Sequence, residues 1–182
     1  DMIETASQFG YRVFYGDASR LDLLRIAGAD TAKVLVVAVD AREASLKIVQ
    51  LCKQHFPHLH VSVRVADVTH AYEILDAGVT DIQREVFESS LAAAHNTLRV
   101  LGHSKEDAKA TIKTFRRHNL DLLQEMHKVH KDRALLIATA KQSRADLEEQ
   151  MSKDKALRSL TSAKAKANAD AIANLFGLPL DK

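Results

Sequence analysis

The chain has 182 residues, of which 46% are hydrophobic and 27% charged, and its formal net charge is +2. This composition is typical of a globular protein with one sizeable core, and the small net charge with few aromatic residues argues against a nucleic-acid partner. No apolar run approaches the length of a membrane span, and the single cysteine, Cys52, excludes an intrachain disulfide and favours a reducing, cytoplasmic setting.

The first 100 residues alternate between helical and extended patterns. In chain order they predict a helix over 2–9, a strand over 11–15, a turn and helix from 16, a strand over 33–39, a helix over 41–55, a strand over 60–65, a helix over 66–77 and a strand over 81–86. The β-branched run from Val34 to Val39 is typical of a parallel strand that is buried on both faces.

After residue 86 the patterns are almost entirely helical. They predict helices over 87–101, 104–130 and 131–150, with Ser104 as an N-cap. Residues 151–174 are rich in Ala and Lys and lack a strong apolar stripe, so this segment is helical by propensity but marginal on its own. The expected organisation is therefore a domain over 1–100, a helical extension over 101–150 and a helical tail over 151–182.

Strands that alternate with helices at this spacing predict an α/β fold with a Rossmann-like parallel sheet, followed by the helical extension. Such a sheet usually opens with a strand, a glycine-rich turn and a helix, but no G-x-G-x-x-G occurs in the chain. We therefore expect a Rossmann-like domain that lacks its first β-α-β part here.

The turn Gly16-Asp17-Ala18 and the residue Asp40 follow the carboxyl ends of predicted strands. Ligands of open α/β sheets bind at that edge, where a carboxylate can accept hydrogen bonds from a ribose or an adenine amine. These four residues are candidates for a nucleotide site. A helix-capping role for Asp17 is the alternative.

A set of polar residues at strand ends and on a helix could hold a small zwitterionic peptide, because Arg binds carboxylates and Asp pairs with an ammonium group. The set consists of Arg64, Asp67, Arg84, Arg116, Arg117 and Asn119. Ordinary surface ion pairs explain the same residues equally simply. The nine histidines are interpreted as surface residues rather than metal ligands, and no catalytic constellation is recognisable.

Five segments of the chain together form a specific pattern: FGYRVFYGDASRLDLL at 9–24, KQHFPHL at 53–59, RVADV at 64–68, REVFE at 84–88 and FRRHN at 115–119. In this order they closely resemble segments of Kef-type glutathione-gated potassium efflux proteins. The resemblance extends to about residue 127, and beyond about 130 it is only to a variable helical extension. The glycine loop of this family, an arginine that follows it and the acidic residue that ends its second strand are absent from this chain.

The resemblance implies a KTN (RCK) regulatory domain that is not an enzyme. It would dimerise on the cytoplasmic face of the bacterial inner membrane, joined to a membrane antiporter domain of the same polypeptide and served by an ancillary flavodoxin-like quinone reductase. AMP or NAD(H) would bind beside Gly16, Asp17, Ala18 and Asp40. Glutathione or its S-conjugates would bind near the dimer interface and control K⁺/H⁺ exchange. The residues that the resemblance assigns to glutathione are Phe9, Asp67, Arg84 and Asn119.

Two other functions share this fold class. One is a nucleotide-dependent oxidoreductase, which would need an acid, base or nucleophile beside the crevice. The other is a regulatory subunit of a potassium uptake channel without a glutathione site, and the FRRHN run at 115–119 counts against it.

Overall fold

The computed structural model describes residues 5, 8–10, 13 and 15–176. The chain divides between Glu88 and Ser89 into two compact units, whose relative positions are not determined, so each is described by itself. The helix expected over 2–9 and the strand expected over 11–15 lie largely outside the described residues.

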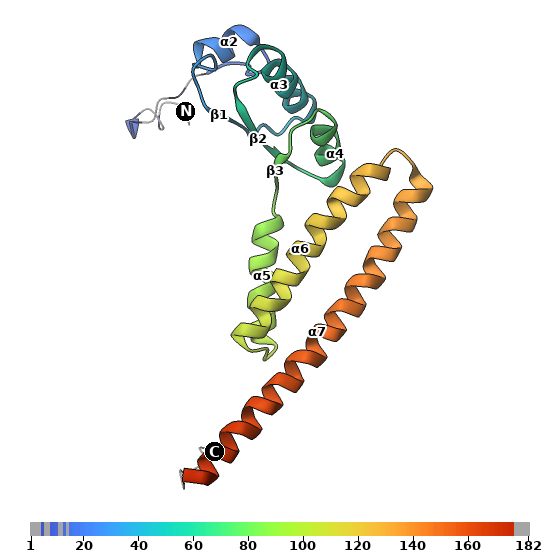
Figure 1. The fold of residues 1–182 in the computed structure, drawn as a ribbon. Coiled ribbons are helices and arrows are strands. Elements are labelled where there is room, and N and C mark those ends of the chain that lie inside the picture. Colours follow the sequence, from blue (N-terminus) through green and yellow to red (C-terminus); the bar gives the residue numbers. More distant parts are fainter. Residues whose placement is uncertain (1–4, 6–7, 11–12, 14, 177–182) are drawn as a thin grey trace. The chain divides into compact units, whose positions relative to one another are not determined.

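The first unit is a three-stranded parallel sheet in the order β1-β2-β3 (Figure 1). Its elements are α2 (Leu21–Ile26), β1 (Val34–Val37), α3 (Arg42–His55), β2 (His60–Val65), α4 (Val68–Asp76) and β3 (Asp81–Arg84). Val36 pairs with Ser62, which in turn pairs with Asp81. This arrangement confirms the parallel α/β fold that the sequence predicts.

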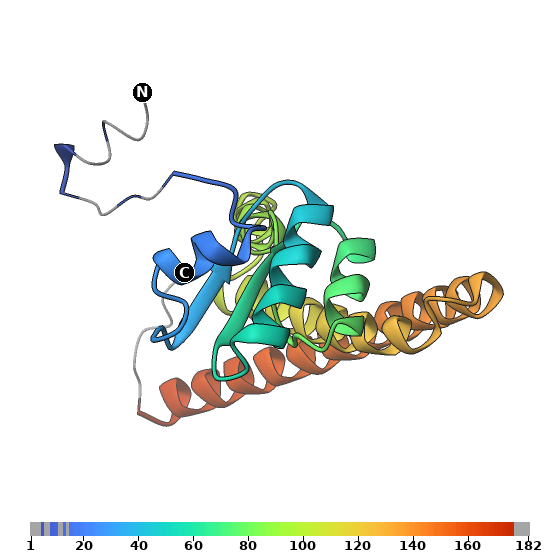
Figure 2. The ribbon, with the colours of Figure 1, turned by 90° about the horizontal axis from the view of Figure 1, so that it is seen from above.

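Helices α3 and α4 lie on one face of this sheet and contact each other (Figure 2). Because crossovers between parallel strands are right-handed, two successive crossovers in the same direction place both helices on the same face. The core between them is apolar and includes Ile48 of α3, Val63 of β2 and Ile74 of α4, all of them buried. Burial of apolar surface here is the main stabilising contribution to the first unit.

The prediction that the strand over 33–39 is buried on both faces is wrong for β1. In β1, Val37 is buried, but Val34 is 53% and Val36 66% exposed. Side chains alternate between the two faces of a strand, and the main helix contacts of this sheet are all on the face that α3 and α4 cover. A run of β-branched residues predicts an extended segment, but it cannot show which faces are covered.

The second unit is helical and comprises α5 (Phe87–Val100, whose first two residues belong to the first unit), α6 (Lys105–Val129) and α7 (Arg133–Phe176). The predicted N-cap is confirmed, because Ser104 Oγ accepts a hydrogen bond of 3.0 Å from the Asp107 amide. Helices α6 and α7 pack against each other after a short connection (Figure 1). The Asp132 carboxylate accepts hydrogen bonds from the first amides of α7.

The helix expected over 131–150 continues through the segment that is helical by propensity, since α7 runs without interruption to Phe176. No glycine or proline occurs between 133 and 176, and side-chain pairs four residues apart, such as Arg144 with Glu148, support the helix. Among the described residues, no helix combines the length and the apolar character that crossing a bilayer requires.

Candidate functional site

Arg64 connects all three strands at the carboxyl edge of the sheet. Its Nη2 donates to the Ala38 carbonyl oxygen after β1 at 2.9 Å and to Asp40 Oδ1 at 2.5 Å. Its Nη1 donates to Glu85 Oε1 after β3 at 2.6 Å. We call Arg64, Asp40, Glu85 and the Ala38 carbonyl the Arg64 cluster. A guanidinium suits this role because its fork of donors can reach several acceptors at once.

A cavity of about 300 Å³ opens beside the Arg64 cluster. It is lined by Val39, Asp40, Arg64, Ala66, His70 and Glu85. The carboxyl edge of a parallel sheet is the usual ligand site of open α/β folds. Asp40, one of the predicted nucleotide residues, therefore lines a pocket in the expected place.

Asp67 lies at the start of α4 and is its N-cap. Its Oδ1 accepts a hydrogen bond of 2.8 Å from the His70 amide. The cap occupies one carboxylate oxygen and leaves the negative charge, with its second oxygen, at the helix N-terminus. Asp67 is exposed, so both a structural and a ligand-binding role are compatible with its position.

His70 carries the most unusual environment at this edge. It is only 2% exposed, its Nδ1 accepts from the Ala66 amide at 3.4 Å, and its Nε2 is buried without a hydrogen-bond partner. An accepting Nδ1 assigns the proton of the neutral ring to Nε2, which is then an unsatisfied donor. Burial, together with the nearby positive charge of Arg42, lowers the pKa of His70. Asp67, Glu73 and Glu43 act in the opposite direction.

We expect this histidine to make the protein less stable as the pH falls below 6.5, the ordinary pKa of histidine. Between that value and the lower pKa of His70 in the folded state, the unfolded chain binds more protons, so the free energy of unfolding rises with pH. One such group contributes at most about 1.4 kcal/mol per pH unit. Urea unfolding at several pH values measures the slope, and His70→Gln should flatten it.

The exposed His58 provides the matched control, because His58→Gln should keep the slope of the parent protein. Carboxylate groups affect the stability in a different, lower pH range. Hydrogen bonds from Arg42 lower the pKa of Glu73, and a hydrogen bond from His60 lowers the pKa of Asp81, so these contributions are lost only at and below their ordinary pKa values of 4.5 and 3.8. An identical slope in His70→Gln and in the parent protein would exclude His70 as its source.

The turn at Gly16, Asp17 and Ala18 is a separate local structure. Asp17 Oδ1 accepts from the Ser19 amide at 2.8 Å, and hydrogen bonds from Ser19 lower the pKa of Asp17. Asp17 is not the N-cap of α2, since Arg20 occupies that position. A Cβ on Gly16 would lie 2.5 Å from Leu23 Cδ1, so a larger residue there would displace the end of the Leu23 side chain. Among the described residues, no hydrogen bond or ion pair joins this turn to Asp40.

The last residue of β3, Arg84, is another predicted residue. The Arg84 guanidinium lies 3.7 Å above the centre of the Phe87 ring, a cation–π contact, and burial lowers its pKa, although arginine stays charged at neutral pH. Val86, between them in the chain, has φ +55°. A β-branched residue in this region is strained, and such strain clusters at ligand sites and switch segments.

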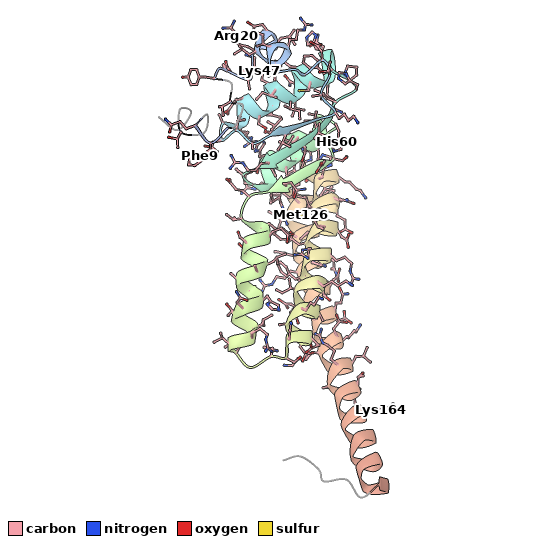
Figure 3. The ribbon with its side chains drawn as sticks, turned by 90° about the vertical axis from the view of Figure 1, so that its left-hand side faces the viewer. Phe9, Arg20, Lys47, His60, Met126 and Lys164 are labelled. Carbon is pink, nitrogen blue, oxygen red and sulfur yellow. The ribbon has the colours of Figure 1, made fainter. Side chains whose placement is uncertain are left out.

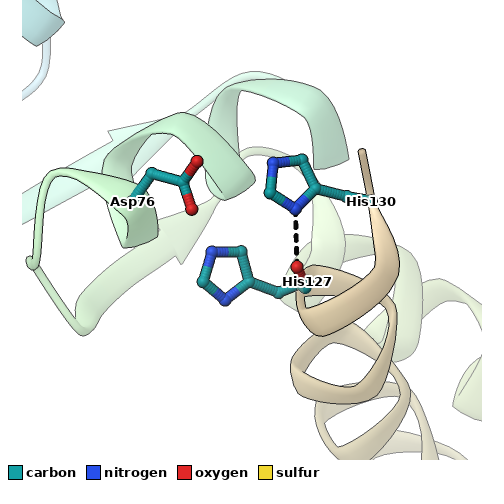
Figure 4. A group of neighbouring side chains, drawn as sticks. All are labelled: Asp76, His127 and His130. Carbon is teal, nitrogen blue, oxygen red and sulfur yellow. Dashed lines mark hydrogen bonds between the residues drawn. The ribbon is translucent and has the colours of Figure 1, made fainter. Parts of the chain in front are cut away.

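Two further predicted residues belong to different units. Phe9 is 76% exposed in the first unit (Figure 3), and Asn119 is half-buried on α6 in the second unit. Near the end of α6, the His127 and His130 rings stack with centroids 5.2 Å apart, and His130 Nδ1 donates to the His127 carbonyl (Figure 4). Asp76, drawn in the same view, belongs to the first unit, and the two histidines belong to the second.

The predicted nucleotide and glutathione residues do not include three members of this edge. The sequence places Arg64 in the polar set that could hold a zwitterionic peptide and Glu85 in the REVFE segment, but it does not indicate that Arg64 is the centre of a cluster or that His70 is buried beside it. Their roles depend on partners 21 to 26 residues away, such as Asp40, or on burial against other elements. No spacing rule along the chain reports such contacts.

Comparison with known proteins divides the chain at the same place as the structure. The sequence model of the TrkA-N domain matches residues 1–85, and the model of the potassium efflux system KefB C-terminal domain matches residues 89–169. A solved structure described as "Shewanella denitrificans Kef CTD in AMP bound form" is 41% identical, with a TM-score of 0.63. The match covers 65% of this chain and 74% of that one.

Proposed function

This chain belongs to the family of C-terminal KTN (RCK) domains of Kef-type potassium efflux systems, and from this membership we propose that it regulates potassium efflux in response to glutathione and an adenine nucleotide. The observation that carries the proposal is the 41% identity to a Kef C-terminal domain whose description includes bound AMP. The cavity at the carboxyl edge of the sheet supports it, because nucleotides bind at that edge in related folds.

The nucleotide, AMP or NAD(H), is proposed to bind beside Gly16, Asp17, Ala18 and Asp40. The carboxylates of Asp17 and Asp40 are both exposed and can accept hydrogen bonds from ribose hydroxyls or an adenine amine. The Asp40 side chain is 96% exposed and pairs with Arg64, so a ligand can replace that contact at small cost.

Glutathione is proposed to contact Phe9, Asp67, Arg84 and Asn119. The tripeptide carries two carboxylates and an ammonium group, for which Arg84 and Asp67 are the complementary charges. The exposed ring of Phe9 offers an apolar surface that a bulky S-substituent can displace. A ligand changes the state of such a module only through its different affinities for two conformations.

The wider setting follows from the family and is proposed with it. The domain acts as a homodimer on the cytoplasmic face of the inner membrane and controls an antiporter domain of the same polypeptide. A flavodoxin-like quinone reductase is the proposed ancillary partner. The domain has a regulatory and not an enzymatic role.

Calorimetric titration of the intact protein with glutathione, a bulky S-conjugate of glutathione and AMP tests this function. We expect saturable binding of all three ligands, with the conjugate competing against glutathione and AMP binding without competition. Nucleotide binding without a glutathione response would favour a regulator of potassium uptake. Turnover of a nicotinamide cofactor would favour an oxidoreductase.

A further inference from the structure

We propose that Arg64 couples the nucleotide site to the glutathione site, so that a bound nucleotide strengthens glutathione binding. This inference rests on the proposed function, because it takes Asp40 as a nucleotide residue and Arg84 as a glutathione residue. Arg64 itself is assigned to neither ligand. It is a positioning residue that acts through the carboxylates on its two sides.

Arg64, on the central strand β2, contacts the ends of both neighbouring strands. It reaches Asp40 and the Ala38 carbonyl after β1 at 2.5 and 2.9 Å, and Glu85 after β3 at 2.6 Å. Glu85 directly follows Arg84 in the chain, and its amide continues the ladder to the Val65 carbonyl at 2.9 Å. One guanidinium therefore joins the chain segments that carry the two sets of proposed ligand residues.

The contacts of Arg64 differ in how easily they are lost. The Asp40 side chain is 96% exposed, whereas those of Arg64 and Glu85 are 32% and 41% exposed. An exposed ion pair contributes little to stability, so hydrogen-bond donors of a bound ligand can replace Arg64 as partners of the Asp40 carboxylate. Arg64 then loses one of its two carboxylate partners and keeps its hydrogen bonds to Glu85 and to the Ala38 carbonyl.

The segment that Glu85 begins has the physical features of a switch. Val86 is held at φ +55°, and Arg84 and Phe87 stack across it at 3.7 Å. A strained residue persists only where its surroundings hold it in place. A stronger Arg64–Glu85 pair would hold residues 84–87 in this conformation and so prepare Arg84 for its ligand, which lowers the ordering cost of binding.

The expected sign is therefore positive coupling, which must be reciprocal between the two ligands. In the intact protein, saturating AMP should tighten glutathione binding by about fivefold or more, the lower end of typical allosteric couplings. The ratio of the two dissociation constants, without and with AMP, is the quantity to measure by calorimetry.

Three variants test the role of Arg64. Arg64→Met and Glu85→Gln should each bring the ratio to within about twofold of one, and the double variant should have no further effect, as expected for residues that act through each other. Lys53→Met is the control, because it removes another cation of the same unit, which donates to the Gly78 carbonyl at 2.6 Å and does not line the cavity. It should keep the ratio of the parent protein.

The outcomes separate this inference from the function it rests on. A parent protein that binds neither glutathione nor AMP overturns both. Binding of both ligands with a ratio of one or below, or an unchanged ratio in Arg64→Met, overturns the role of Arg64 and leaves the function intact. A ratio lost in Lys53→Met as well would show that general destabilisation removes the coupling, which also overturns the specific role.

Discussion

Replacing Ile74 with alanine should lower the free energy of unfolding of the first unit by about 2–5 kcal/mol, the usual cost of removing a large buried aliphatic side chain. Ile74 is 0% exposed on α4, the helix that contacts both β2 and β3. The substitution removes transfer free energy and leaves a cavity that a packed core fills only in part. Urea unfolding followed by circular dichroism measures the loss.

Val68→Ala on the same helix is the control, because Val68 is exposed and the change should cost well under the core value. Equal losses from the two substitutions would mean that α4 is not packed on the sheet as described. A loss for Ile74→Ala below about 1 kcal/mol would contradict the assignment of Ile74 to the core.

Combined replacement of Arg84 and Asn119 by alanine should weaken glutathione binding by at least about 30-fold, which corresponds to the loss of about 2 kcal/mol. Replacing Arg84 removes a charge-assisted, two-pronged hydrogen bond to a ligand carboxylate. Replacing Asn119 removes a side-chain amide that both donates and accepts hydrogen bonds. Titration calorimetry gives the affinity. Binding of AMP should remain, because neither residue is assigned to the nucleotide.

Two controls separate a direct contact from a change in fold or net charge. Arg144→Ala removes a positive charge from the exposed side of α7 and should leave glutathione binding as it is. Arg84→Lys keeps the charge but loses the planar fork, so we expect an intermediate affinity. Full affinity in the Arg84→Ala, Asn119→Ala double variant would place the glutathione site elsewhere.

The elements of the sheet could be predicted because their signals are local. Alternation in HVSVRV predicts β2, Pro57 and Phe56 mark the end of α3, and Ser104 is followed by an acidic residue at the third helical position, which predicts the start of α6. Each of these patterns acts within a few residues of the backbone that it determines. The observed β2, α3 and α6 confirm them.

The candidate site was predictable only in outline. That Asp40 would lie at a carboxyl edge follows from its place after a strand, because parallel strands end at the same edge. The placement of Glu85 and His70 around Arg64 cannot be predicted in this way, since the sequence does not indicate which hydrogen-bond donors reach which acceptors after folding. The proposed ligand residues Phe9 and Asn119 belong to different units, and their ligand roles stay predictions.

By itself, the sequence determined the type and order of the described elements, the parallel α/β class and the resemblance to a family. The tertiary structure alone decided that Val36 is exposed on β1, that Arg64 connects three strand ends and that His70 is buried with an unpaired Nε2. The physical reason is the range of the forces involved. Backbone preferences and caps act between neighbours in the chain, whereas burial and hydrogen-bond partners depend on elements that meet only after folding.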